Sequence, residues 1–138
     1  MTVLVDTTVW SLALRRRLRR LSKAESAAVD SWRGLVEEGR AALMGPIRQE
    51  ILSGIRDGKA FESLREILSA FRCLEVLPID YDQAAWNFNQ CRSAGVAAGH
   101  VDMLICATAS RHEVPIFSTD RDFGRYERYL PITLHSQR

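Results

Sequence analysis

The sequence predicts a three-layer α/β/α domain with a central, mainly parallel sheet, and three observations lead to this prediction. Short runs such as Val3–Val5 are apolar on both faces, as strands buried in a parallel sheet are. Helical segments alternate with these runs and can make the crossover connections that parallel strands need. No internal repeat, low-complexity segment or linker interrupts the chain, so we expect one domain over residues 1–138.

Composition narrows the class of protein further. The hydrophobic fraction of 46% and the charged fraction of 26% are those of a soluble globular protein, and a net charge of +2 excludes no partner. No apolar run approaches the roughly 20 residues of a membrane span, and no signal-peptide pattern is present. Cys73, Cys91 and Cys106 are odd in number and far apart, which indicates buried free thiols. We therefore expect a cytoplasmic protein without a membrane partner.

The first strand is followed by a predicted helix over residues 7–21, and the second half of this helix is strongly basic. Its arginines are Arg15, Arg16, Arg17, Arg19 and Arg20. Such a cluster suits nucleic-acid phosphates, a protein-partner surface or a solvated helix face, and all three interpretations stay open. Ser22-Lys23-Ala24-Glu25 has the form of a capping box and predicts the start of the next helix, for which Gly39 is a plausible C-cap.

A second strand is predicted at Ala42–Met44, and Pro46 suits the first turn of the helix after it. Glu50 lies about one turn into that helix, near the carboxyl end of the strand. On local evidence alone it is an ordinary surface glutamate. Phe61–Phe71 then gives the clearest amphipathic helix in the chain.

A third strand is predicted at Cys73–Ile79, closed by Pro78, and Asp80 predicts the acidic cap of the following helix. The next helix, over about residues 100–112, is nearly all small or apolar. Asp102 stands near its start. A carboxylate beside such a face is costly unless it is paired, caps the helix or binds a cation, which favours a functional interpretation.

A fourth strand is predicted at Val114–Ser118, and an acidic loop containing Asp120 and Asp122 follows it. A last short strand is predicted at Ile132–Leu134. The expected order of elements is β-α-α-β-α-α-β-α-α-β-(α)-β.

Four acids can meet in this fold. Asp6 and Asp120 follow predicted strands, whereas Glu50 and Asp102 lie early in helices. If the first strand is central and the fourth lies beside it, both aspartates stand over one crevice at the carboxyl ends of the strands. Carboxylates that lie so close together repel one another, and a divalent cation relieves this repulsion. Oxygen ligands favour Mg²⁺ or Mn²⁺ as the cation. The alternative for Asp6 is that it only caps the following helix.

Such a site favours metal-dependent phosphodiester hydrolysis, and no phosphate-binding glycine loop or serine nucleophile motif competes with it. Three alternatives stay open. A phosphatase with Asp6 as nucleophile lacks its usual second aspartate, since position 8 is Thr8. A DNA-directed nuclease of the same fold would use the same acids. A catalytically silent module would bind RNA or a partner without turnover, although the complete set of four acids argues against it.

Four segments together resemble the PIN-domain ribonucleases, specifically the VapC-type toxins of toxin–antitoxin pairs. The segments are Val3–Trp10, Pro46–Gly54, Asp102–Ala109 and Ser118–Phe123. By position, the resemblance implies that Asp6, Glu50, Asp102 and Asp120 are the catalytic and metal-binding acids. It makes Asp122 a peripheral acid, and it implies that Thr7 and Ser118 orient carboxylates or water. Cys106 departs from the alanine that is more usual in the family.

The resemblance also implies the activity and the partners. It implies Mg²⁺- or Mn²⁺-dependent endonucleolytic cleavage of RNA, with 5′-phosphate and 3′-hydroxyl ends, a cognate VapB-type antitoxin that blocks the site, and a homodimer. We expect the antitoxin to lie along the apolar and basic surface of residues 9–21 and 55–71. The sequence names neither the RNA that is cut nor the number of metal ions.

Overall fold

The computed structural model describes residues 1–15 and 20–136. Within these residues the strands are β1 (Val3–Val5), β2 (Ala41–Met44), β3 (Arg72–Leu74) and β4 (Ile116–Phe117). They form one parallel sheet in the order β3-β2-β1-β4. The chain passes from β1 to β3 in one direction and then returns to place β4 on the other side of β1. The structure therefore meets the condition under which Asp6 and Asp120 stand over one crevice, namely an internal first strand with the fourth strand beside it.

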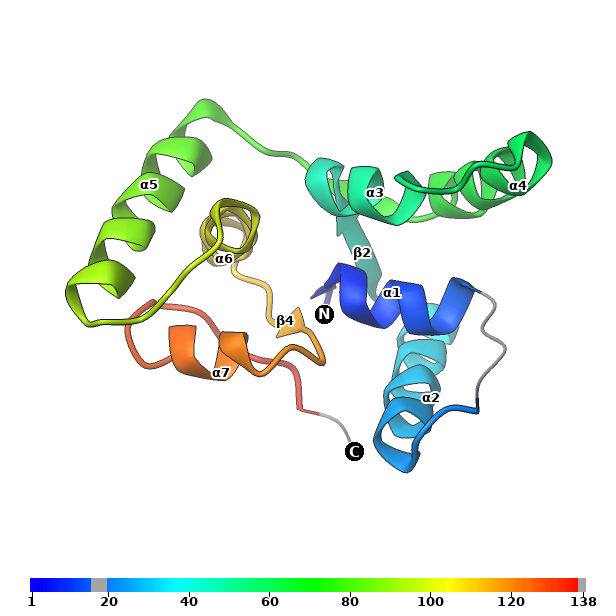
Figure 1. The fold of residues 1–138 in the computed structure, drawn as a ribbon, viewed down its shortest axis with the longest axis horizontal. Helices are drawn as coiled ribbons and strands as arrows, with labels where there is room; N and C mark the ends of the chain where they lie inside the picture. The colour runs from blue at the N-terminus through cyan, green and yellow to red at the C-terminus, as the bar shows by residue number, and fades with distance from the viewer. Residues whose placement is uncertain (16–19, 137–138) are drawn as a thin grey trace.

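Helices cover both faces of the sheet and complete the three predicted layers. They are α1 (Thr7–Leu14), α2 (Lys23–Glu37), α3 (Gly45–Leu52), α4 (Gly58–Ser69), α5 (Pro78–Ser93), α6 (His100–His112) and α7 (Asp122–Tyr126). Helix α5 packs along α6, and α1 packs against both α2 and α3 (Figure 1). None of the helices in the described part of the chain combines the length and apolar character needed to cross a bilayer.

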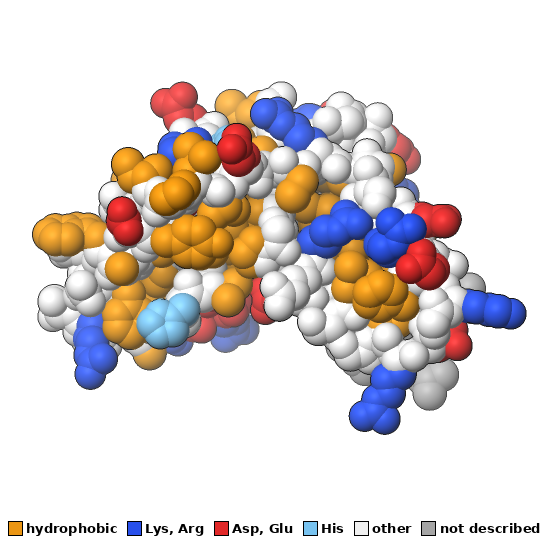
Figure 2. All heavy atoms as spheres, turned by 90° about the horizontal axis from the view of Figure 1, so that it is seen from above, with side chains coloured by type: hydrophobic (Ala, Val, Ile, Leu, Met, Phe, Trp, Pro, Cys, Tyr) orange, Lys and Arg blue, Asp and Glu red, His pale blue; other side chains and the backbone are white. Residues whose placement is uncertain are grey.

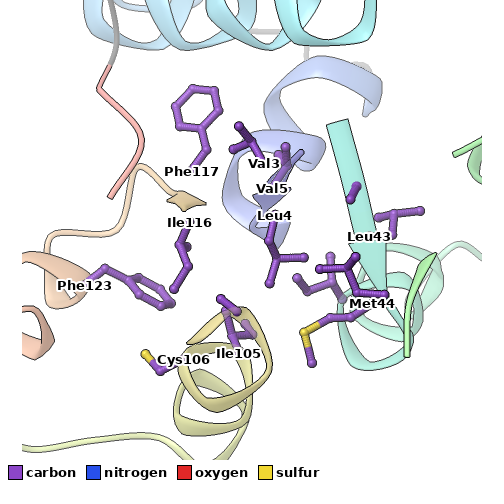
Figure 3. Close-up of a cluster of buried hydrophobic side chains, with 14 of the residues drawn as sticks. Val3, Leu4, Val5, Leu43, Met44, Ile105, Cys106, Ile116, Phe117 and Phe123 are labelled. Carbon is purple, nitrogen blue, oxygen red and sulfur yellow. The ribbon is translucent and has the colours of Figure 1, made fainter. Parts of the chain in front are cut away.

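Strand β1 runs through the middle of the core, and its side chains alternate between the two faces of the sheet. The core side chains of β1 and β4 that point toward α6 in Figure 3 are Leu4 and Ile116. Those that point the other way, toward α2, are Val3, Val5 and Phe117. All three residues of β1 are fully buried, which confirms a strand that is apolar on both faces. Strand β1 ends at Val5, so Asp6 stands directly at its carboxyl end.

An aromatic cluster holds α1 and α2 against the sheet. The Trp10 ring contacts Trp32 edge-on at 5.7 Å and Phe71 at 4.8 Å between ring centroids. Its indole nitrogen donates a 2.8 Å hydrogen bond to the Val5 carbonyl oxygen. Since Trp10 is fully buried, these contacts fix the start of α1 relative to the end of β1.

Local signals set both ends of α2 as predicted. Ser22 Oγ accepts a hydrogen bond from the Glu25 amide at 3.1 Å, and the Glu25 carboxylate accepts one from the Ser22 amide at 2.9 Å. The capping box is therefore confirmed. At the other end, Gly39 adopts φ 69° just beyond the helix, a conformation that costs a residue without Cβ little. The Arg40 amide then donates to the Leu35 carbonyl oxygen at 2.8 Å, which closes the last turn.

Four predicted elements are shorter than expected, and one of them is β4, which spans Ile116–Phe117 and not Val114–Ser118. Helix α1 ends at Leu14, not at residue 21, because Arg15 has extended backbone angles and Leu21 lies outside any helix. Strand β3 ends at Leu74, short of the predicted Ile79. Pro78, which was expected to close the strand, instead begins α5, where its missing N–H costs nothing. The last predicted strand is reduced to a single bridge between Ile116 and Leu134.

Two smaller expectations also need correction. Asp80 lies inside the first turn of α5, not at its N-cap, and its carboxylate accepts a 2.8 Å hydrogen bond from the Leu77 amide. All three cysteines are free, but Cys73 is exposed, whereas Cys91 and Cys106 are buried.

Candidate active site

Asp6, Glu50, Asp102 and Asp120 line one open cleft of about 1010 Å³. The cleft lies beyond the carboxyl ends of β1 and β4, where the strand order reverses. Figure 2 shows the molecular surface hollowed between two lobes, with acidic side chains beside the hollow. The structure therefore brings together the four acids singled out from the sequence, and their assignment to a metal ion stays a prediction.

Asp6 is the most deeply buried of these acids, with 5% of its surface exposed. Its Oδ2 accepts hydrogen bonds from Ser118 Oγ at 2.7 Å and from Thr8 Oγ1 at 3.1 Å. Burial raises the pKa of Asp6, hydrogen bonds from Ser118, the Thr7 amide and Thr8 oppose this rise, and the charge of Asp120 adds to it. The carboxylate is thus held in the cleft by hydroxyl groups.

The alternative role of Asp6 as a helix cap is not what its side chain performs. Asp6 occupies the N-cap position of α1, and its backbone oxygen accepts a hydrogen bond from the Val9 amide at 3.1 Å. Its carboxylate makes no capping hydrogen bond to the helix. The side chain is instead turned toward the loop after β4.

That loop is joined to Asp6 through hydroxyl groups. The Asp120 amide donates to Ser118 Oγ at 3.0 Å, and the Thr119 amide donates to Thr8 Oγ1 at 3.2 Å. Ser118 was predicted to orient a carboxylate or water, and in the structure its hydroxyl donates a hydrogen bond to the Asp6 carboxylate. Thr8 was not predicted as a site residue; its position two residues after Asp6 was the available signal.

Glu50 reaches the cleft from α3, and Thr7 holds it there. Thr7 Oγ1 donates a 3.1 Å hydrogen bond to Glu50 Oε1, which links the start of α1 to α3. Glu50 is exposed at the mouth of the cleft. Thr7 was predicted to orient a carboxylate or water, and its hydroxyl orients the Glu50 carboxylate through Oε1.

Asp102 lies in the first turn of α6, and burial raises its pKa to about 6. A hydrogen bond from the Tyr126 hydroxyl to Asp102 Oδ2 at 3.1 Å opposes this rise, and the charges of Asp6, Asp120 and Glu50 add to it. Burial and the Asp102 charge raise the pKa of Tyr126, so the phenol keeps its proton and donates. The charges of the other three acids therefore disfavour ionisation of Asp102, an effect that a cation among them would reverse.

Asp102, Asp120 and Asp122 form the tightest group of acids. Each offers one carboxylate oxygen within 4.8 Å of those of the other two. The Asp122 amide donates to Asp120 Oδ1 at 2.9 Å, and the Asp122 carboxylate pairs with Arg125 at 3.1 Å. Among the described residues that line the cleft there is no histidine or cysteine, so the donors are hard oxygens. This donor set fits Mg²⁺ or Mn²⁺ and does not fit a zinc site.

The basic run does not converge on the acids as far as it is described. The Arg15 guanidinium donates to the Ser53 carbonyl oxygen at 3.0 Å and borders a separate groove. Arg20 is exposed, and Arg16, Arg17 and Arg19 lie outside the described residues. Among the described residues lining the acidic cleft, Arg121 carries the one positive charge. It was not predicted, although it stands between Asp120 and Asp122.

Comparison with known proteins gives a consistent result. A PIN domain family model matches residues 3–129. The chain is similar to ribonuclease VapC11 of Mycobacterium tuberculosis, with 35% identity over 139 aligned positions that cover 99% of each chain. It is also similar to the solved VapBC2 from Rickettsia felis bound to a DNA fragment from their promoter (TM-score 0.73, 16% identity, 98% of each chain). A further similar structure is FitAcB from Neisseria gonorrhoeae (TM-score 0.68, 19% identity, 99% of this chain and 98% of that chain). At these identities the two solved structures show the fold.

Proposed function

The chain belongs to the PIN-domain family, and on that premise we propose that it is a Mg²⁺- or Mn²⁺-dependent endoribonuclease and the toxin of a toxin–antitoxin pair. We also propose that residues 1–138 form one PIN domain. The observation that carries the proposal is the cleft that gathers four carboxylates, three of which raise the pKa of the fourth, Asp102. The similarity to a ribonuclease over 99% of both chains supports RNA as the substrate class.

The carboxylates divide the work in this proposal. Asp102 and Asp120, with Asp6 beside them, would hold the cation, and Asp122 would contribute at the periphery. When bound, a hard divalent cation lowers the pKa of water and stabilises charge on a phosphoryl group. Ser118 and Thr8 keep Asp6 oriented, because both hydroxyls donate to the same oxygen, Oδ2.

Glu50 has a different environment and a different proposed role. It is exposed, and the Thr7 hydroxyl fixes one of its oxygens. It can therefore accept a proton from water at the mouth of the cleft. Attack by this water on phosphorus breaks the bond to the 3′ oxygen, which takes up a proton, and leaves a 5′-phosphate and a 3′-hydroxyl.

A cognate antitoxin is the proposed protein partner, in line with a solved structure of similar fold, a toxin–antitoxin complex from Klebsiella pneumoniae. The apolar groove bordered by Arg15 supports the expected location along residues 9–21 and 55–71. Its apolar lining residues include Leu14, Ile55, Leu64 and Ile67. Ile67, on α4, is 47% exposed in this groove and so is accessible to a partner. A homodimer is proposed from the family alone.

The test is cleavage of total RNA with mapping of cut sites and end chemistry. Wild type is expected to cut with Mg²⁺ or Mn²⁺ and to leave 5′-phosphates, whereas Asp102→Asn should not cut. Matched RNA and DNA oligonucleotides distinguish a ribonuclease from a DNA-directed nuclease. Equal cleavage of both, or full activity of Asp102→Asn, would contradict the proposal.

A further inference from the structure

Tyr126 is a buried phenol that points at the acidic cleft from the last turn of α7. Its side chain is 1% exposed, and its hydroxyl donates a 3.1 Å hydrogen bond to Asp102 Oδ2. Among the described residues, no other side chain donates a hydrogen bond to the Asp102 carboxylate. The only described donor to this carboxylate thus comes from a helix that lies 24 residues further along the chain.

The position of Tyr126 on α7 connects two acids. Residues four apart on a helix lie on the same side, so Tyr126 and Asp122 face the same way. Asp122 is also part of the group whose carboxylate oxygens lie within 4.8 Å of Asp102 and Asp120. One short helix therefore carries both an acid of the group and the donor that orients another.

The Tyr126 ring has little freedom to move away from this contact. It packs edge-on against Phe123, with 5.4 Å between ring centroids, and both side chains are buried. A fixed ring holds the hydroxyl at a defined place relative to α6. Packing of the Tyr126 ring against Phe123 thus fixes the hydroxyl that orients the Asp102 carboxylate.

We infer that Tyr126 is a positioning residue, whose hydroxyl holds the Asp102 carboxylate in the orientation in which it binds a divalent cation together with Asp120 and Asp122. The inference rests on the proposed metal-dependent nuclease activity. Hydrogen-bond partners of metal ligands act in this way at other metal sites, where removing one typically costs about 10- to 100-fold in metal affinity or activity.

The test is Mn²⁺ binding by calorimetry at pH 7.5, without RNA, for wild type and Tyr126→Phe. This change removes one oxygen and keeps the buried ring, and far-UV circular dichroism checks that the variant is folded. The Kd for Mn²⁺ is expected to rise about 10-fold or more. The matched control is Tyr129→Phe, since Tyr129 lies three residues further on and is 47% exposed; its Kd should equal that of wild type.

A second measurement separates orientation from general loosening of the fold. The RNA-cleavage rate of Tyr126→Phe should recover toward that of wild type as Mn²⁺ is raised, whereas Asp102→Asn should not recover at any concentration. Unchanged Mn²⁺ affinity in Tyr126→Phe, or equal losses in both tyrosine variants, would overturn the inference and leave the proposed function intact. If wild type itself bound no Mn²⁺, the proposed function would fail first.

Discussion

Ser118 Oγ donates a 2.7 Å hydrogen bond to Asp6 Oδ2, although the two residues are 112 positions apart in the sequence. The bond spans the point at which the strand order reverses, because Asp6 follows β1 and Ser118 follows β4. It is the shorter of the two hydroxyl hydrogen bonds to this buried carboxylate. The same hydroxyl accepts from the Asp120 amide, so one serine fixes an acid on each side of the cleft.

Replacing Ser118 should therefore destabilise the fold. In Ser118→Ala, the buried Asp6 carboxylate loses one donor and the Asp120 amide loses its acceptor, which should cost about 1–3 kcal/mol of the free energy of unfolding at pH 7.5. Urea denaturation measures this loss. Because the hydrogen bond favours the ionised form of Asp6 and lowers its pKa, the loss should shrink as the pH falls and Asp6 becomes protonated.

Ser118→Thr is the matched control, since it keeps a hydroxyl at the same position. It should retain most of the stability that Ser118→Ala loses. Equal losses in the two variants, or a loss that does not depend on pH, would show that the hydrogen bond to Asp6 is not what Ser118 contributes.

Asp102 should make stability depend on pH and on metal. Its pKa is raised from 3.8 to about 6, so the folded state binds more protons than the unfolded state between these values. Stability should therefore fall as the pH rises from about 4 to about 6 and stay lower above that range, by at most about 3 kcal/mol. Asp102→Asn removes this penalty, and without divalent metal it should melt at a higher temperature than wild type at pH 7.5.

Differential scanning calorimetry at pH 4 and pH 7.5 checks the sign. The advantage of Asp102→Asn should be present at pH 7.5 and small near pH 4. Adding Mn²⁺ should raise the Tm of wild type, because a ligand that binds only the folded state stabilises it, and should raise that of Asp102→Asn less. Equal responses of the two proteins to Mn²⁺ would argue against a shared acidic metal site.

Elements with strong local signals could be predicted from the sequence. The apolar run of β1, the capping box at Ser22 and the small apolar residues of α6 each specify one structure by themselves. The full sheet order was not predicted, but a central first strand with the fourth strand beside it was assumed, and the structure has this placement. That placement is also why Asp6 and Asp120 were expected over one crevice, although they lie far apart in the sequence.

The errors have a different origin. Pro78 fits the end of a strand as well as the first turn of a helix. The hydrogen bond from the Leu77 amide to the Asp80 carboxylate, which the sequence does not reveal, favours the helix. Tyr126 had no signal at all, because a tyrosine between Arg125 and Glu127 is indistinguishable from an ordinary surface residue. Its proposed role follows from the hydrogen bond between Tyr126 on α7 and Asp102 on α6, which is a long-range contact.

Asp6→Asn should abolish most of the RNA cleavage. Removing one charge from the cation site is expected to cost several kcal/mol of transition-state stabilisation, which corresponds to at least about a 100-fold loss in kcat. Single-turnover cleavage of an RNA oligonucleotide at saturating Mn²⁺ measures this loss. Asp82→Asn is the control, because Asp82 is exposed on α5 and does not line the cleft, and it should cleave at the wild-type rate. Near-normal cleavage by Asp6→Asn would end the assignment of this acid.

Arg121 should bind the RNA backbone. It carries the one positive charge among the described residues that line the acidic cleft, and its side chain is exposed. A cation at this position can hold a phosphate next to the scissile bond, so Arg121→Gln should raise KM more than it lowers kcat. It should also reduce the slope of log affinity against log salt by about 1, the value for one lost phosphate contact.

Arg128→Gln is the matched control for Arg121→Gln, since Arg128 is exposed but does not line the cleft. Binding to an RNA oligonucleotide over a series of salt concentrations distinguishes them, and an unchanged salt slope in Arg121→Gln would remove this residue from the RNA-binding surface.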